Sequence, residues 1–105
     1  MDVFQALADP TRRAIVAMLA PGERSAGEIG AHFEVTAPAI SQHLKALRLA
    51  RLVRVRVEAQ RRIYQLDPRG LGALKTWLFS VHRVWGEQAA AARSAPTSGG
   101  DRGRI

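Results

Sequence analysis

The sequence contains no cysteine, which excludes disulfide bonds, thiolate zinc sites, iron–sulfur clusters and cysteine nucleophiles. Long hydrophobic runs are also missing, because the longest apolar stretch, residues 14–20, is about a third of the roughly 20 residues that a bilayer-spanning helix needs. An arginine pair precedes this stretch, but Pro21 and Gly22 end it without the cleavage pattern of an export signal. We therefore expect a cytoplasmic protein without a transmembrane segment.

Histidine is scarce, and its placement predicts no metal site. No two of His32, His43 and His82 are three or four residues apart, the spacing that brings two ligands together on a helix. Glu87 follows His82 but lies too far round a helix to share a metal with it. Ser41 and His43 are two residues apart and point in different directions, so they cannot form a nucleophile and its base. We expect no metal, no cofactor and no enzymatic activity.

Acidic residues are outnumbered, and the excess positive charge is concentrated in one segment. The chain has 16 Lys and Arg against 9 Asp and Glu, a net charge of +7. Residues 51–66 hold five arginines and one glutamate, which is a net +4 of that total. The five are Arg51, Arg54, Arg56, Arg61 and Arg62. This cluster indicates a polyanionic partner, although charge alone fits a solvated strand pair equally well.

The length of 105 residues is too short for two packed domains, and 47% apolar residues suffice for one small core. We expect a single domain over residues 1–92. Small and polar residues dominate the rest of the chain, so we expect residues 93–105 to form a disordered tail.

Helix signals recur through the first half of the chain. Apolar spacing favours a short helix over residues 3–7, and Asp9 before Pro10 is typical of a second helix start. Ser25 and Glu28 form the capping box of a third helix that runs to about residue 33. After a tight turn, Thr36 is the N-cap of a fourth helix over residues 36–49.

The second half changes from a strand period to a helix period. Valines alternate with arginines from residue 52, and a second alternating run ends at residue 66, which predicts a β-hairpin over residues 52–66. Asp67 and Pro68 start a final helix with a heptad-like apolar seam. The seam residues are Leu71, Leu74, Leu78, Val81 and Trp85.

This order of four helices, a hairpin and a final helix is that of a winged helix-turn-helix fold, mainly α with a β-hairpin, in which the helix after the tight turn enters the DNA major groove. If Ile40 and Leu44 are buried, Gln42 and Lys45 face outward and Ser41 lies at the edge of that face. Glutamine can pair with adenine, serine can contact any base edge, and lysine pairs with phosphate. The hairpin arginines would form a positively charged wing.

Three blocks of the sequence carry a family resemblance. They are residues 4–15 (FQALADPTRRAI), residues 37–45 (APAISQHLK) and residues 61–68 (RRIYQLDP). In this order and spacing they resemble the ArsR/SmtB family of bacterial transcriptional regulators over about residues 3–90. The resemblance implies a homodimeric repressor that binds operator DNA, often its own promoter, and dimerises through its first and last helices. It also implies that positions 37, 38, 41 and 42 read bases.

The sequence departs from the family's metal sensors. Many members bind metal through a cysteine pair on the third helix or through an aspartate–histidine set on the last helix, and this chain has neither. Ala37 stands where glutamine is common, and the wing turn lacks the usual glycine. The resemblance therefore implies a regulator of the type that does not sense metals.

These arguments predict two sets of site residues. The DNA-binding set is Thr36, Ala37, Pro38, Ser41, Gln42, Lys45, Arg54, Arg56, Arg61 and Arg62. The dimer-interface set is Phe4, Leu7, Trp77, Val81, Val84 and Trp85. Two other functions fit the same residues, namely a winged-helix protein-interaction module and a binder of nucleic acid or anionic membrane without sequence preference. The sequence identifies neither the operator nor an inducer.

Overall fold

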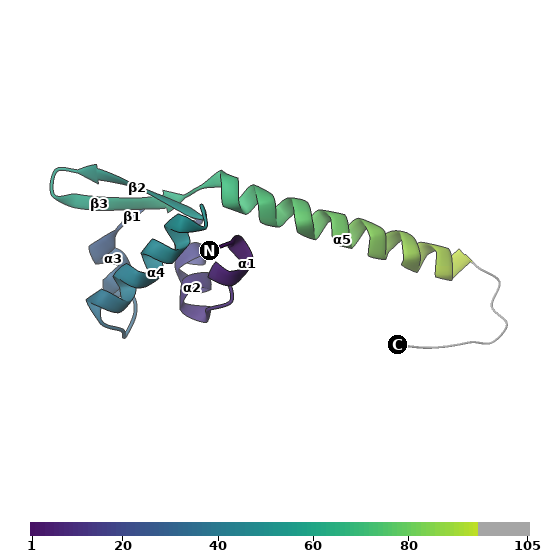
Figure 1. Cartoon of the computed structure of the whole chain (residues 1–105), viewed down its shortest axis with the longest axis horizontal. Helices are drawn as coiled ribbons and strands as arrows, with labels where there is room; N and C mark the ends of the chain where they lie inside the picture. Colours follow the sequence, from purple (N-terminus) through teal and green to yellow (C-terminus); the bar gives the residue numbers. More distant parts are fainter. Residues whose placement is uncertain (95–105) are drawn as a thin grey trace. The chain divides into compact units, whose positions relative to one another are not determined.

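The computed structural model describes residues 1–94 and confirms the expected winged helix-turn-helix order of elements (Figure 1). In chain order the elements are α1 (Val3–Ala6), α2 (Pro10–Leu19), β1 (Arg24–Ser25), α3 (Ala26–Ala31), α4 (Ala37–Leu49), β2 (Val53–Glu58), β3 (Arg61–Leu66) and α5 (Pro68–Ser94). In Figure 1, α1 to α4 lie together below the β2–β3 hairpin. The short strand β1 is an addition to the predicted order.

The chain divides into two compact units, Met1–Lys75 and residue 76 onward. The first unit holds α1 to β3 and the start of α5, and the second holds the rest of α5. This helix includes residues 93 and 94, which the sequence had assigned to the tail, and the remainder of that predicted tail, residues 95–105, lies outside the described residues. Among the described helices, none combines the length and the apolarity needed to cross a membrane.

Three helices begin where the sequence predicted, because a side chain caps each start. The Asp9 carboxylate accepts the backbone N–H of Arg12 at 3.0 Å. Ser25 and Glu28 exchange the two bonds of the capping box, at 3.1 and 2.8 Å. Thr36 Oγ1 accepts a backbone N–H in the first turn of α4 at 3.2 Å. Each cap satisfies a donor that a helix start leaves unpaired, which contributes about 1 kcal/mol.

The third helix ends earlier than predicted. Its last residue is Ala31, whereas the apolar spacing indicated about residue 33. The backbone N–H groups of His32 and Phe33 donate to carbonyls three residues earlier, at 3.1 and 3.3 Å. The chain therefore tightens into a turn here, and this turn leads directly to the cap of α4.

The sheet has the order β1-β3-β2, with both pairs antiparallel. β2 and β3 form the predicted hairpin, in register from Val53 opposite Leu66 to Glu58 opposite Arg61. β1 adds two residues to the other edge of β3. A two-residue strand is too short to produce an alternating pattern, which is why the sequence did not reveal it.

The core of the first unit is formed by apolar side chains from all its helices and from the base of the hairpin. The buried cluster comprises Val3, Ala6, Ile15, Leu19, Ile29, Ile40, Leu44, Leu47, Ala50, Leu52, Val53 and Tyr64. Leu71 and Leu74 of α5 pack against this cluster and are partly buried. Each fully buried leucine or isoleucine stabilises the fold by roughly 1.5–3 kcal/mol, so the core fixes the position of α4 against the hairpin.

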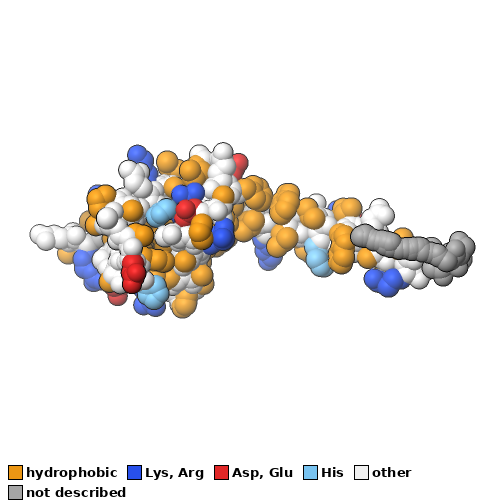
Figure 2. All heavy atoms as spheres, turned by 90° about the horizontal axis from the view of Figure 1, so that it is seen from below, with side chains coloured by type: hydrophobic (Ala, Val, Ile, Leu, Met, Phe, Trp, Pro, Cys, Tyr) orange, Lys and Arg blue, Asp and Glu red, His pale blue; other side chains and the backbone are white. Residues whose placement is uncertain are grey.

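The later part of α5 keeps many large apolar side chains at its surface. Figure 2 shows hydrophobic side chains along this helix. The exposed ones are Trp77, Leu78, Phe79, Val81, Val84 and Trp85. Five of the six fall on one stripe at about 100° per residue, and Phe79 lies on the opposite side. The residues of the predicted seam therefore lie in two environments. Leu71 and Leu74 pack against the core, and the later positions are exposed.

Candidate nucleic-acid interface

Helix α4 presents the predicted polar face to solvent. Ile40 and Leu44 are buried, which turns Ser41, Gln42 and Lys45 outward, and all three are exposed. The three predicted residues at the start of the helix, Thr36, Ala37 and Pro38, are exposed as well. This face is therefore accessible to a ligand along its whole length.

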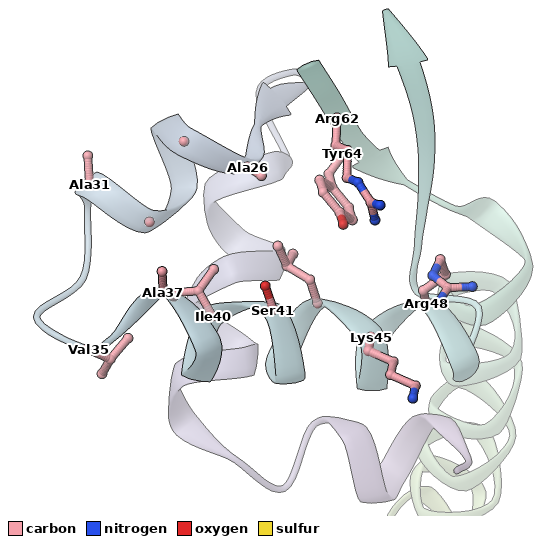
Figure 3. Close-up of a pocket in the computed structure, with 13 residues that line it drawn as sticks. Ala26, Ala31, Val35, Ala37, Ile40, Ser41, Lys45, Arg48, Arg62 and Tyr64 are labelled. Atoms are coloured by element: carbon pink, nitrogen blue, oxygen red, sulfur yellow. The ribbon is translucent and has the colours of Figure 1, made fainter. Parts of the chain in front are cut away.

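One side of α4 borders a groove of about 850 Å³ (Figure 3). The other walls are α3 and β3. The lining residues are Ala26, Gly27, Gly30, Ala31, Val35, Ala37, Ile40, Ser41, Leu44, Lys45, Arg48, Arg62 and Tyr64. Alanine and glycine on α3 leave the space open, because no long side chain projects from that wall. In Figure 3, Arg62 and Tyr64 extend from β3 toward α4.

The groove brings together two cations that the sequence predicted for DNA contacts and a third that it did not. Lys45 comes from α4 and Arg62 from β3, as predicted for DNA contacts. Arg48 was not in the predicted set, although it lies seven residues after Ser41 and therefore on the same side of the helix. The helical period could have revealed it.

The other wing arginines make contacts within the chain. Arg56 donates to both carboxylate oxygens of Glu23 at 2.7 Å, and to Glu58 at 3.3 Å. The hydrogen bond from Arg56 lowers the pKa of Glu23 and raises the pKa of the arginine itself. Arg61 Nη2 lies 3.9 Å from Glu28. These arginines therefore have acidic partners of their own.

Arg54 lies at the base of the wing opposite Gln65. With the Gln65 amide turned so that its oxygen faces the guanidinium, this oxygen accepts bonds from Arg54 Nη2 and Nε at 2.8 and 3.0 Å. The pair links the two strands across the sheet. Arg54 is thus held by its neighbour on β3.

The wing turn is formed without glycine. Ala59 adopts the left-handed conformation, with φ of 58°, at the tip between β2 and β3. Glycine takes this conformation at lower cost than alanine, because it has no Cβ.

His43 links α4 to the start of α2. Its Nδ1 lies 3.4 Å from the Arg12 guanidinium and 3.8 Å from the Asp9 carboxylate. The hydrogen bond from the backbone N–H of Arg12 lowers the pKa of Asp9. The described residues contain no group of three histidine, aspartate or glutamate side chains that could hold a metal ion.

The predicted dimer residues fall in two environments. Leu7 is partly buried against the core of its own unit, so it is less available to a partner than predicted. Phe4 and the four α5 residues are exposed, with Trp85 exposed by 65%. The exposed members are Phe4, Trp77, Val81, Val84 and Trp85.

Known proteins of similar sequence and structure are transcriptional regulators. The chain is 54% identical over 82 residues to the HTH-type transcriptional regulator Rv2034 of Mycobacterium tuberculosis, covering 78% of this chain and 74% of that protein. It is 35% identical over 79 residues to the transcriptional repressor SdpR of Bacillus subtilis, covering 75% and 88%. The solved structure of an ArsR-like transcriptional regulator from Rhodococcus sp. RHA1 superimposes with a TM-score of 0.73 at 28% identity, covering 91% of each chain.

Residues 9–55, from the cap of α2 into β2, match the family described as bacterial regulatory protein, arsR family. The match includes α3, the tight turn and α4, so the sequence similarity covers the helix-turn-helix itself. Family members are DNA-binding regulators, which confirms the expectation that the chain is not an enzyme. The chain belongs to the arsR family of bacterial regulatory proteins and is a DNA-binding transcriptional regulator.

Proposed function

We propose that the chain is a homodimeric repressor that binds a pseudo-palindromic operator, its own promoter included. The observation that carries this proposal is the outer face of α4. Ser41 and Gln42 are exposed there, and in the described part of the chain their side chains make no hydrogen bond or ion pair. A polar face without internal partners is available to read base edges in a major groove.

The chemistry of this face suits sequence reading. Gln42 can pair with N6 and N7 of adenine, and Ser41 can donate to or accept from a base edge. The Thr36 hydroxyl accepts the Ala39 N–H and Pro38 has no N–H, so the Ala37 N–H is the one that the first turn keeps for a phosphate. The wing would add contacts to the backbone or a narrow minor groove. The predicted DNA-binding set remains a prediction, and within it Arg54 and Arg56 are set apart because their guanidinium groups already have partners on Gln65 and Glu23.

The apolar stripe on α5 supports the dimer. Leu78, Val81 and Trp85 are exposed on one side of this helix, and a second copy would remove them from water. Two-fold symmetry would place two α4 helices about 34 Å apart, one turn of B-DNA. Repression is the favoured direction because three relatives, SdpR among them, are repressors, whereas HlyU of Vibrio cholerae is an activator. As a bacterial transcriptional regulator, the chain would act in the cytoplasm, where the DNA lies.

Selection of bound fragments from random duplex DNA at two salt concentrations tests this proposal. The expected result is a pseudo-palindromic motif enriched at both concentrations. The double variant Ser41→Ala/Gln42→Ala should lose the motif and keep the salt dependence of binding, because the phosphate contacts remain. A protein-interaction module predicts no enriched motif and weak binding. A general polyanion binder predicts steep salt dependence without a motif, and either result would overturn the proposal.

A further inference from the structure

Arg62 occupies a different face of the wing from the other arginines. Side chains alternate along a strand, so Arg62 and Tyr64 share one face of β3 and Arg61 lies on the other. The register places Arg54 and Arg56 opposite residues of that other face. The wing therefore has an arginine face that is paired within the chain and a second face, with Arg62, that borders the groove beside α4.

The groove holds three cations without acidic partners. Lys45, Arg48 and Arg62 line it together, and within residues 1–94 their side chains form no ion pair or hydrogen bond. Lys45 and Arg48 are also three residues apart on one helix, where like charges repel. Such a group adds nothing to the stability of the fold. It is suited to an anion that comes from outside the chain.

The hydroxyl of a largely buried tyrosine points into the same groove. Tyr64 is 6% exposed, and Figure 3 shows its oxygen directed toward the space beside α4. In the described residues this hydroxyl has no hydrogen-bond partner. Polar groups of buried side chains are nearly always paired, so an unpaired hydroxyl aimed into a groove lined by cations indicates a missing acceptor.

We propose that this groove binds the phosphates of one DNA strand between α4 and the wing. Lys45 and Arg48 contact them from the helix, Arg62 contacts them from β3, and the Tyr64 hydroxyl donates to a phosphate oxygen. Arg54 and Arg56 act within the protein and hold the wing in shape. The inference rests on the proposed function and deepens it, since it adds two residues to the predicted DNA-binding set and assigns two others an internal role.

The shape of the groove favours a nucleic-acid backbone. A DNA strand carries one negative charge per 3.4 Å of helix axis, so cations on both walls of the groove can neutralise neighbouring phosphates. The α3 wall has alanine and glycine at Ala26, Gly27, Gly30 and Ala31, which lets a bulky sugar–phosphate chain approach closely. Lysine and arginine are also the side chains that most often contact phosphate in protein–DNA complexes.

The salt dependence of binding tests this assignment. Binding of the full chain to a labelled mixed-sequence duplex of about three helical turns is measured by anisotropy over a series of NaCl concentrations. Arg48→Gln and Arg62→Gln should each reduce the slope of log K against log salt by about 0.9 for each subunit on the DNA, or about 1.8 for the proposed homodimer, because every subunit loses one phosphate contact. Arg54→Gln and Arg56→Gln are the matched controls, because each removes the same charge, and their slopes should stay near that of the native chain. Thermal melts verify folding.

The hydroxyl is tested separately by Tyr64→Phe. This change should weaken duplex binding roughly fivefold for each subunit on the DNA, the loss of one hydrogen bond per subunit, without altering the slope. The melting temperature of the Tyr64→Phe variant should equal that of the native chain or exceed it, because the hydroxyl has no partner in the described part of the protein. Unchanged affinity would remove Tyr64 from the site.

Equal slope losses for Arg54→Gln and Arg62→Gln would overturn the groove assignment, because net charge would then account for binding. Native slopes for Arg48→Gln and Arg62→Gln would also overturn it. Neither outcome affects the operator proposal, which depends on the motif selected from random duplex and its loss in the Ser41→Ala/Gln42→Ala variant. Conversely, if the chain selects no motif but the variants show the expected slopes, the groove assignment is supported and the operator proposal is overturned.

Discussion

The backbone N–H of Gly70 donates a hydrogen bond of 2.8 Å to the carbonyl oxygen of Arg51, and this contact joins the start of α5 to the end of α4. Arg51 has a left-handed backbone, with φ of 60°. Its N–H donates to Arg48 at 3.0 Å, and the N–H of Leu52 donates to Leu47 at 2.9 Å. These two bonds form the Schellman motif that ends many helices. The helix that carries the polar face is thereby connected to the helix that carries the apolar stripe.

We predict that Gly70→Ala strongly destabilises the protein. A Cβ at this position would lie 2.7 Å from the carbonyl carbon of Arg51 and 3.0 Å from the oxygen of Ala50, and both are backbone atoms that cannot move aside cheaply. The free energy of unfolding should fall by about 2 kcal/mol or more, measured by urea denaturation.

The matched control is Gly72→Ala, two residues further along α5, where a Cβ would meet nothing within 4 Å. It should stabilise the helix by about 0.5–1 kcal/mol, because alanine has the higher helix propensity. Equal effects of the two substitutions would show that the close approach to Arg51 has no energetic importance.

A second prediction concerns the left-handed residue itself. Arg51→Gly should raise the free energy of unfolding by about 0.5–1 kcal/mol, because glycine adopts a positive φ without the Cβ clash that costs other residues roughly 1–2 kcal/mol. Arg51→Ala keeps the Cβ and should bring no such gain. If Arg51→Ala stabilised the protein as much, the arginine side chain rather than the backbone would be the cause.

The caps at Asp9, Ser25 and Thr36 could be predicted from the sequence because each depends on residues three apart. The ion pair between Glu23 and Arg56 could not, because the two residues are 33 positions apart and meet through the folded sheet. The wing arginines are therefore equivalent in the sequence pattern, whereas in the structure they differ in their partners.

The third prediction concerns acid stability. Asp67 is 1% exposed, and hydrogen bonds from Arg69 lower the pKa of this carboxyl to about 2. Because the folded-state pKa lies below the ordinary value near 3.8, the ion pair stabilises the fold above that value and is lost as the pH falls through about 2. Asp67→Asn should therefore lower the free energy of unfolding by about 1–2 kcal/mol at neutral pH. This value is smaller than the full pKa shift implies, because the Arg69 side chain is 62% exposed and water screens its charge.

The measurement is the unfolding free energy of native and Asp67→Asn chains between pH 7 and about pH 2. The difference between the two should shrink as the pH drops below about 4. The difference between the native chain and Arg69→Gln should shrink in the same way, although in this variant the backbone N–H of residue 69 still donates to Asp67. A difference that stayed constant down to the lowest pH would contradict an ionised Asp67 as the stabilising group.

The last prediction tests the apolar stripe on α5. Val81 and Trp85 are four residues apart and lie about 40° from each other around the helix, whereas Phe79 lies about 160° from Val81. All three are exposed, so a glutamate at any of them is compatible with the folded monomer. Val81→Glu and Trp85→Glu should convert a dimer to monomers, because a carboxylate buried in an apolar interface without a partner costs several kcal/mol. Phe79→Glu should leave the dimer intact, and sedimentation equilibrium measures all three. Dissociation by Phe79→Glu alone would place the interface on the opposite side of the helix, and a native chain that sediments as a monomer would remove the dimer from the proposed function.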